Sequence, residues 1–110
     1  MTMTLREKQS TFMWMLADLI RHADHLGYEL TMGRGYVSPE ANEAVGGHPE
    51  SNHLNRLAID LNLFKDGRFL RTTEAHRPLG EYWESIGGAW GGRFAKGDGN
   101  HYSLEHNGVK

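Results

Sequence analysis

Apolar residues recur at helical spacing near the start of the chain. Between residues 4 and 26 they fall largely on one helical stripe, and Gly27 follows as a natural C-terminal stop. A second such pattern covers residues 73–86. Between these segments, Ser38 followed by Pro39 is typical of a helix start, because Ser caps a helix and Pro fits its first turn. The pattern therefore predicts two long helices and a short helix over residues 39–45.

Strand-like alternation marks other segments. Residues 57–64 (LAIDLNLF) form the clearest predicted strand, and the turn after them contains Asp66 and Gly67, a pair that readily adopts the positive φ of a hairpin. Residues 28–32 and 101–105 are shorter candidates. The order of these elements predicts an α+β fold, with a small, mostly antiparallel sheet and flanking helices, in a single domain over residues 1–110.

Composition narrows the possible partners. Formal net charge is −2, from 12 basic and 14 acidic residues without a basic block, which argues against nucleic acid. The chain has no cysteine, so neither a disulfide nor a thiolate metal site is available. No apolar run is long enough for a bilayer, and residues 1–8 lack the apolar core of a signal peptide. We expect a monomer made in the cytoplasm, without stable membrane association, that acts outside it only after release.

Four polar residues are candidates for metal binding or proton transfer. His53 precedes Asp60, and the alternation of the predicted strand places Asp60 away from its apolar face, so Asp60 is either a ligand or simply exposed. Asp98 stands three residues before His101, just ahead of the last predicted strand. Imidazole and carboxylate are normal zinc ligands, and a second carboxylate near the metal can accept a proton from water. No HExxH motif occurs, which excludes the common helical zinc-protease arrangement.

Several segments together resemble a known family. Residues 51–60 (SNHLNRLAID) look like the Ser-x-His-(x)6-Asp signature of the zinc D,D-carboxypeptidase and L-alanyl-D-glutamate endopeptidase family, which includes many phage endolysins. Residues 90–94 (WGGRF) and 98–105 (DGNHYSLE) resemble its second signature, and residues 36–40 (YVSPE) resemble its Tyr-Arg-Thr-Pro-Glu segment. The resemblance implies the hedgehog/D,D-peptidase fold, with Zn²⁺ bound by His53, Asp60 and His101 and with Asp98 as the catalytic base.

The chain departs from the family pattern at two positions. Arg56 stands where the family usually has Gly, and Val37 stands where an Arg often contributes to substrate binding. Arg34 lies nearby, and a guanidinium suits a peptide carboxylate, but the sequence leaves open whether Arg34 replaces that arginine or is a solvated turn residue. The candidate substrate-binding residues are Arg34, Ser51 and Trp90.

The expected function is hydrolysis of peptidoglycan stem peptides. Cleavage between L-Ala and D-Glu, by a phage or prophage lysin acting on the cell wall or periplasm after release, is our first hypothesis. Two alternatives stay open: a D-alanyl-D-alanine carboxypeptidase of the same family, and a zinc-binding module of this fold without catalysis. Asp98 distinguishes an enzyme from the zinc-binding module. A purely structural zinc site does not need an additional carboxylate beside an open coordination position.

Overall fold

The computed structural model describes residues 2–110. Its longest helix, α1 (Leu5–His25), begins at a capping box, in which Thr4 Oγ1 accepts a hydrogen bond from the amide of Glu7 at 3.1 Å and the Glu7 carboxylate accepts from the amide of Thr4 at 2.9 Å. The helix predicted over residues 4–26 is confirmed, with Thr4 and Leu26 as its caps. The buried stripe of α1 consists of Phe12, Met15, Leu16, Leu19 and Ala23.

The other two helices also begin at the predicted residues. The side chain of Ser38 caps α2 (Pro39–Ala44), and the side chain of Thr72 caps α3 (Thr73–Ser85). Helix α3 buries Leu79 and Trp83 against α1 and the sheet. Both helices end one residue earlier than the sequence predicted, since the final residue in each case serves as the C-cap.

The sheet is antiparallel throughout, which confirms the predicted fold class. Its strands are β1 (Glu29–Met32), β2 (Ala58–Lys65), β3 (Arg68–Leu70), β4 (Ala89–Trp90) and β5 (His101–Ser103). Their order is β1-β2-β5-β4, and β3 pairs with β2 through the predicted hairpin turn, where Asp66 and Gly67 have φ values of 51° and 77°. Strand β4 was not predicted, because a two-residue strand is too short to show alternation, and β5 ends two residues before the predicted boundary.

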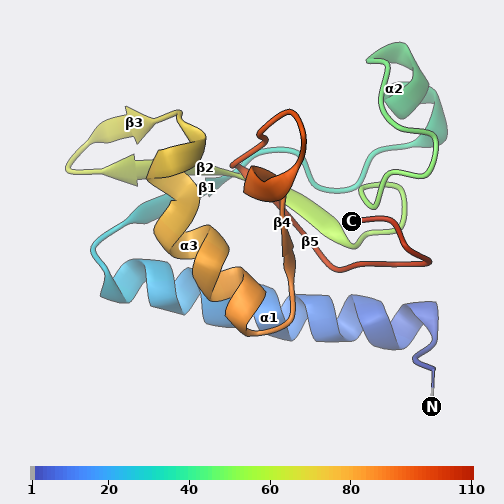
Figure 1. Cartoon of the computed structure of the whole chain (residues 1–110), viewed down its shortest axis with the longest axis horizontal. Helices are drawn as coiled ribbons and strands as arrows, with labels where there is room; N and C mark the ends of the chain where they lie inside the picture. Colours follow the sequence, from blue (N-terminus) through green and yellow to red (C-terminus); the bar gives the residue numbers. More distant parts are fainter. Residues whose placement is uncertain (1) are drawn as a thin grey trace.

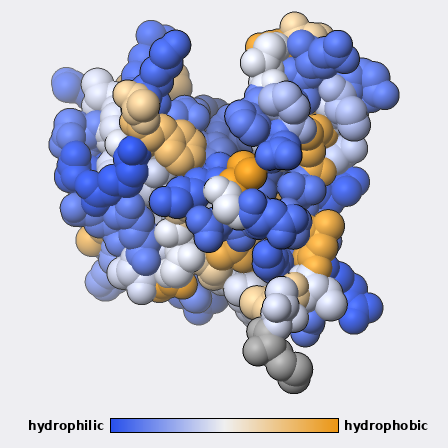
Figure 2. Space-filling view, turned by 45° about the vertical axis from the view of Figure 1, so that its right-hand side comes forward, coloured by the Kyte–Doolittle hydropathy of each residue, from blue (hydrophilic) through white to orange (hydrophobic). Residues whose placement is uncertain are grey.

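The two faces of β2 have different roles. Ile59, Leu61 and Leu63 are buried in the core with α1 and α3, whereas Asp60 and Asn62 on the other face are only partly buried. Helix α1 runs along one side of the sheet, and α2 stands apart from the other two helices (Figure 1). Figure 2 shows a largely hydrophilic surface that is hollowed between two projecting parts at its upper edge. The half-polar face of the sheet is therefore the one available for a site.

Within residues 2–110, none of the helices combines the length and apolar character needed to cross a bilayer.

Candidate metal centre

The register of β2 against β5 places two of the predicted ligands side by side. Asp60 and His101 are Cα partners in this antiparallel pair. Backbone hydrogen bonds fix the register on both sides, because the amide of Asp60 donates to the carbonyl of Arg34 at 2.8 Å and the amide of Leu61 donates to the carbonyl of Asn100 at 2.9 Å. Directly opposite residues project from the same face of a sheet, so the two side chains meet.

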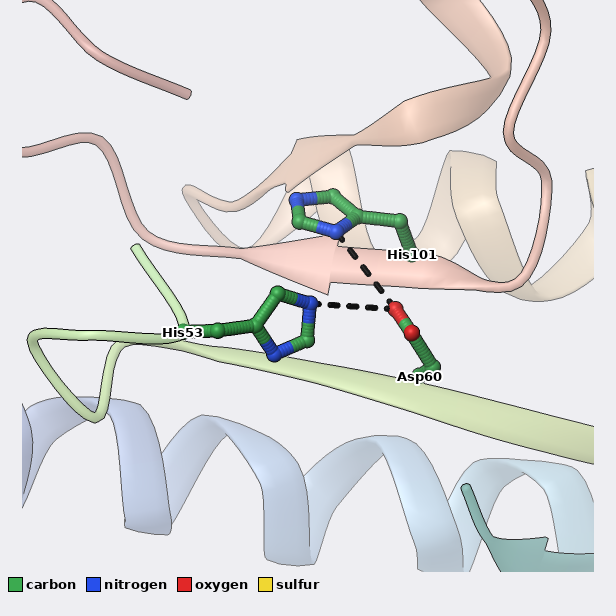
Figure 3. Close-up of side chains that lie close together, drawn as sticks. All are labelled: His53, Asp60 and His101. Atoms are coloured by element: carbon green, nitrogen blue, oxygen red, sulfur yellow. Dashed lines mark ion pairs between the residues drawn. The ribbon is translucent and has the colours of Figure 1, made fainter. Parts of the chain in front are cut away.

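His53 reaches the same point from the turn that precedes β2. Its amide donates to Ser51 Oγ at 3.2 Å, which holds the turn, and its ring Nδ1 lies 2.8 Å from the carbonyl oxygen of Gly35. Because a carbonyl can only accept, Nδ1 carries the proton and Nε2 keeps its lone pair. Nε2 faces Asp60 (Figure 3). The bond to Gly35 thus orients the ring for metal binding, as the outer hydrogen bonds of histidine ligands commonly do.

The three side chains converge on one point. Oδ1 of Asp60 lies 3.3 Å from Nε2 of His53 and 3.5 Å from Nδ1 of His101 (Figure 3). One potential ligand atom from each residue lies within 4.8 Å of the other two. Oδ1 of Asp60 and Nε2 of His101 are buried and have no hydrogen-bond partner among residues 2–110, an arrangement that costs free energy unless a cation compensates it. Two imidazoles and one carboxylate are a normal donor set for zinc, so the residues present fit this metal.

The charges at the site favour metal binding at one carboxylate and proton transfer at another. Burial alone would raise the pKa of Asp60, but the facing imidazoles of His101 and His53 lower it to about 2. Burial opposes the charged form of His53, yet the neighbouring Asp60 carboxylate outweighs it and raises the pKa of His53. Partial burial, reinforced by the charge of Asp60 and opposed by that of His101, raises the pKa of Asp98. Asp60 is therefore ionised, and Asp98 binds a proton more readily than an ordinary aspartate.

Asp98 borders the cavity that contains the three ligands. This cavity has a volume of about 390 Å³. The amide of Asp98 donates to the carbonyl of Gly91 at 2.9 Å, and its own carbonyl accepts from the amide of His101 at 3.1 Å. The loop that carries Asp98 is thus attached to η1 (Gly91–Arg93) at one end and to the ligand on β5 at the other. The structure brings all four residues of the proposed site together.

The candidate substrate residues have different locations. Arg34 and Ser51 line the cavity of the metal centre. Trp90, expected at the border of the cleft, is instead 1% exposed and does not line this cavity. Its ring packs against Gly80 of α3, where a Cβ would collide with it, and its Nε1 donates to the carbonyl of Gly99 at 2.7 Å. We correct its placement accordingly: Trp90 lies behind the Asp98 loop and supports it.

Further residues that line the cavity include Asn42, His48 and Phe94. His48, which is close to His53 in the sequence, was a weaker candidate for the lining of the cleft, whereas no such role was predicted for Asn42 or Phe94. The side chain of Asn42 donates to the carbonyl of His48 at 2.9 Å and so holds the loop after α2 against the helix. Asn42 belongs to α2, and Phe94 follows η1 at the end of the WGGRF segment. Neither residue type suggests metal chemistry, so only the folded structure shows that both border the site.

The fold and the site together define a class of protein: a small α+β domain with a two-histidine, one-aspartate centre beside an open cavity, as in catalytic rather than structural zinc sites. Residues 45–104, more than half of the chain, match the family described as D-alanyl-D-alanine carboxypeptidase. The chain belongs to this family of D,D-carboxypeptidases and endopeptidases, as its motifs predicted. It is a zinc metallopeptidase of the kind that acts on peptidoglycan.

Solved structures share the fold. The L-Ala D-Glu endopeptidase ChiX of Serratia marcescens has a TM-score of 0.63 at 20% sequence identity, over 82% of this chain and 77% of its own. A mutant of the D,D-pentapeptidase VanY from a VanB-type vancomycin resistance cassette, in complex with Zn(II), has a TM-score of 0.60 at 20% identity, over 86% of this chain and 70% of its own. No curated protein sequence matches this chain.

Proposed function

We propose that this zinc peptidase is an L-alanyl-D-glutamate endopeptidase acting as a cell-wall lysin. The observation that carries the proposal is that Asp98 borders two cavities, one of about 390 Å³ with the metal ligands and one of about 350 Å³ beside the β2–β3 hairpin. Space on both sides of the base suits a peptide that continues in both directions from the scissile bond. A D,D-carboxypeptidase needs room for only one residue beyond that bond.

The residues of the site divide the chemistry between them. His53, Asp60 and His101 would hold the zinc ion, which when bound would polarise the scissile carbonyl as a Lewis acid and lower the pKa of water to about 7. Asp98 accepts the proton of the attacking water and then donates it to the leaving amine. Its raised pKa supports both steps, because a carboxylate with a higher pKa is a stronger base towards water and then holds the proton until the leaving amine accepts it.

The description of the matching family favours a second candidate, a D-alanyl-D-alanine carboxypeptidase. Its reaction would use the same ligands and base on the terminal peptide bond of the stem. The lysin role and a phage or prophage origin rest on the similarity of residues 51–60 and 90–105 to endolysin signatures. Action on the cell wall as a monomer, after release from the cytoplasm, is part of the same proposal.

Mass spectrometry of peptides released from defined peptidoglycan tests these alternatives. We expect zinc-loaded protein to produce new N-terminal D-Glu, and a chelator to abolish the reaction until zinc is restored. Release of D-alanine without cleavage at L-Ala would instead establish the carboxypeptidase. If the zinc-loaded protein cuts neither bond in several wall types, the chain is a zinc-binding module without catalysis.

A further inference from the structure

Arg71 lies beside the second cavity, on the side of Asp98 that faces the β2–β3 hairpin. The wall of this cavity of about 350 Å³ includes Asn62, Phe69, Arg71 and Asp98. In Figure 1 the loop after η1 rises between this hairpin and α2. The lining of this cavity includes Asp98 and residues of the hairpin but none of the three metal ligands, so the cavity extends the site along the hairpin.

Strand register explains why these side chains share one face. Phe64 pairs with Phe69 across the hairpin, and Phe64 shares one face of β2 with Asn62 and Asp60. Phe69 therefore projects on the face that carries the metal centre, and Arg71, two residues further, continues that face. Arg68 pairs with Lys65 and projects on the opposite face.

Arg71 has no acidic partner in the part of the chain that the structure describes. Arg77 and Arg93 form ion pairs with glutamates of α3, but none of the ion pairs within residues 2–110 includes Arg71. Its guanidinium lies 5.4 Å from the centre of the Phe69 ring. A guanidinium beside an aromatic ring, with its donors unclaimed, is well suited to bind a carboxylate through two parallel hydrogen bonds.

A substrate carboxylate close to Asp98 would need such a cation. Asp98 carries negative charge when it acts as base, and like charges at short range repel each other. In a stem peptide cut between L-Ala and D-Glu, the D-Glu is linked onward through its γ-carboxyl and keeps a free α-carboxylate. That group lies on the leaving-amine side, next to the scissile bond, whereas the L-Ala side offers no free carboxylate.

We propose that Arg71, with Phe69 beside it, forms a subsite for the free α-carboxylate of D-Glu on the leaving side of the substrate. The subsite makes the enzyme prefer walls in which this carboxylate is not amidated. The identity of the carboxylate rests on the proposed endopeptidase function. Arg34 is the rival for the same group, but it lines the metal cavity, on the other side of Asp98.

The test measures binding, so it does not depend on turnover. Zinc-loaded protein is titrated by NMR with γ-D-glutamyl-meso-diaminopimelate, which lacks the scissile bond, and with the same peptide carrying an α-carboxamide. We expect the carboxamide to bind about tenfold more weakly or worse, as expected for the loss of a hydrogen bond between charged groups. Arg71→Gln should remove this preference, whereas the matched change Arg68→Gln on the opposite face should retain it.

The remaining outcomes are equally decisive. Equal binding of the two peptides to the unchanged protein, no binding of either, or loss of the preference in Arg34→Gln but not in Arg71→Gln would each overturn the subsite. Cleavage assays separate this result from the proposed function. If the protein prefers the carboxylate peptide but does not cleave at L-Ala, the subsite is supported and the endopeptidase function is refuted. If the protein cleaves at L-Ala but shows no preference, the endopeptidase function is supported and the subsite is refuted.

Discussion

The amide of Asp98 donates a hydrogen bond to the carbonyl of Gly91 at 2.9 Å, and the two backbones lie in direct contact. A Cβ at Gly91 would collide with the carbonyl oxygen of Asp98 and lie 2.8 Å from Cβ of His101. The same Asp98 carbonyl accepts the amide of His101 at 3.1 Å. The position of the base and that of one metal ligand therefore both depend on the absence of a side chain at this glycine.

Gly91→Ala should lower both stability and activity. The added methyl group must displace backbone rather than the end of a flexible side chain, and such overpacking typically costs about 1–3 kcal/mol. We expect a lower midpoint of chemical denaturation and a fall of about tenfold or more in kcat/KM, since a small displacement of catalytic groups strongly lowers the reaction rate. Gly35→Ala is the matched control, because a Cβ there meets no atom within 4 Å. Equal behaviour of the two variants would contradict the role assigned to Gly91.

Asp98→Asn should separate metal binding from catalysis. Zinc content measured by metal analysis should stay at the wild-type level, because Asp98 is not among the ligands. Cleavage of purified cell walls should fall by about 10²–10⁴-fold, the usual contribution of a general base. Asp66→Asn makes the same change of charge in the hairpin turn, where Asn tolerates the φ of 51°, and should keep full activity. Full lytic activity in Asp98→Asn would refute its role as base.

His76 should make the fold sensitive to acid. This residue is 2% exposed, its Nδ1 lies 2.8 Å from the Tyr102 hydroxyl, and burial lowers its pKa from 6.5 to about 4. Between these values the unfolded chain binds the proton and the folded chain does not. Its contribution is therefore complete above pH 6.5 and is lost as pH falls toward 4, by about 3 kcal/mol in total.

Denaturation of chelator-treated protein across this pH range checks the His76 prediction. His76→Gln should be less stable at neutral pH but should lose less stability than wild type as the solution is acidified. The control His25→Gln changes an exposed histidine at the end of α1 and should follow the wild-type curve. Parallel curves for wild type and His76→Gln would show that His76 does not carry the effect.

Arg56 stands at the position where the family usually has Gly, and its backbone explains that preference. Its φ is 58°, in the left-handed region, and its guanidinium lies 4.0 Å from the centre of the Tyr36 ring. Arg56→Ala loses the cation–π contact but keeps the strained backbone, so it should be destabilised by about 1 kcal/mol. Arg56→Gly loses the same contact and relieves the strain, so its unfolding free energy should exceed that of Arg56→Ala. The opposite order would show that the left-handed conformation is not strained.

Local signals in the sequence predicted the helices and the longer strands, and resemblance to a family predicted the metal ligands. Helix stripes and caps lie within a few residues of one another, so Thr4, Ser38 and Thr73 marked helix starts to within one residue. The spacing within each signature is also local, so the resemblance to the family predicted His53, Asp60 and His101 as ligands, and the structure brings these three residues together. Alternation along residues 57–64 correctly separated Asp60 from the core face of β2.

Only the tertiary structure decided how these pieces meet. The β2–β5 register that joins Asp60 to His101 links distant segments, and the sequence contains no periodic signal for it. The same is true of Trp90, whose place behind the Asp98 loop depends on its packing against Gly80 of α3. No sequence pattern marks Arg71, which lies between a strand and a helix. The folded hairpin places it beside the cavity that Asp98 borders. Residue chemistry and local periodicity can be read along the chain, but a cavity is formed by non-local packing, and that packing exists only in the folded state.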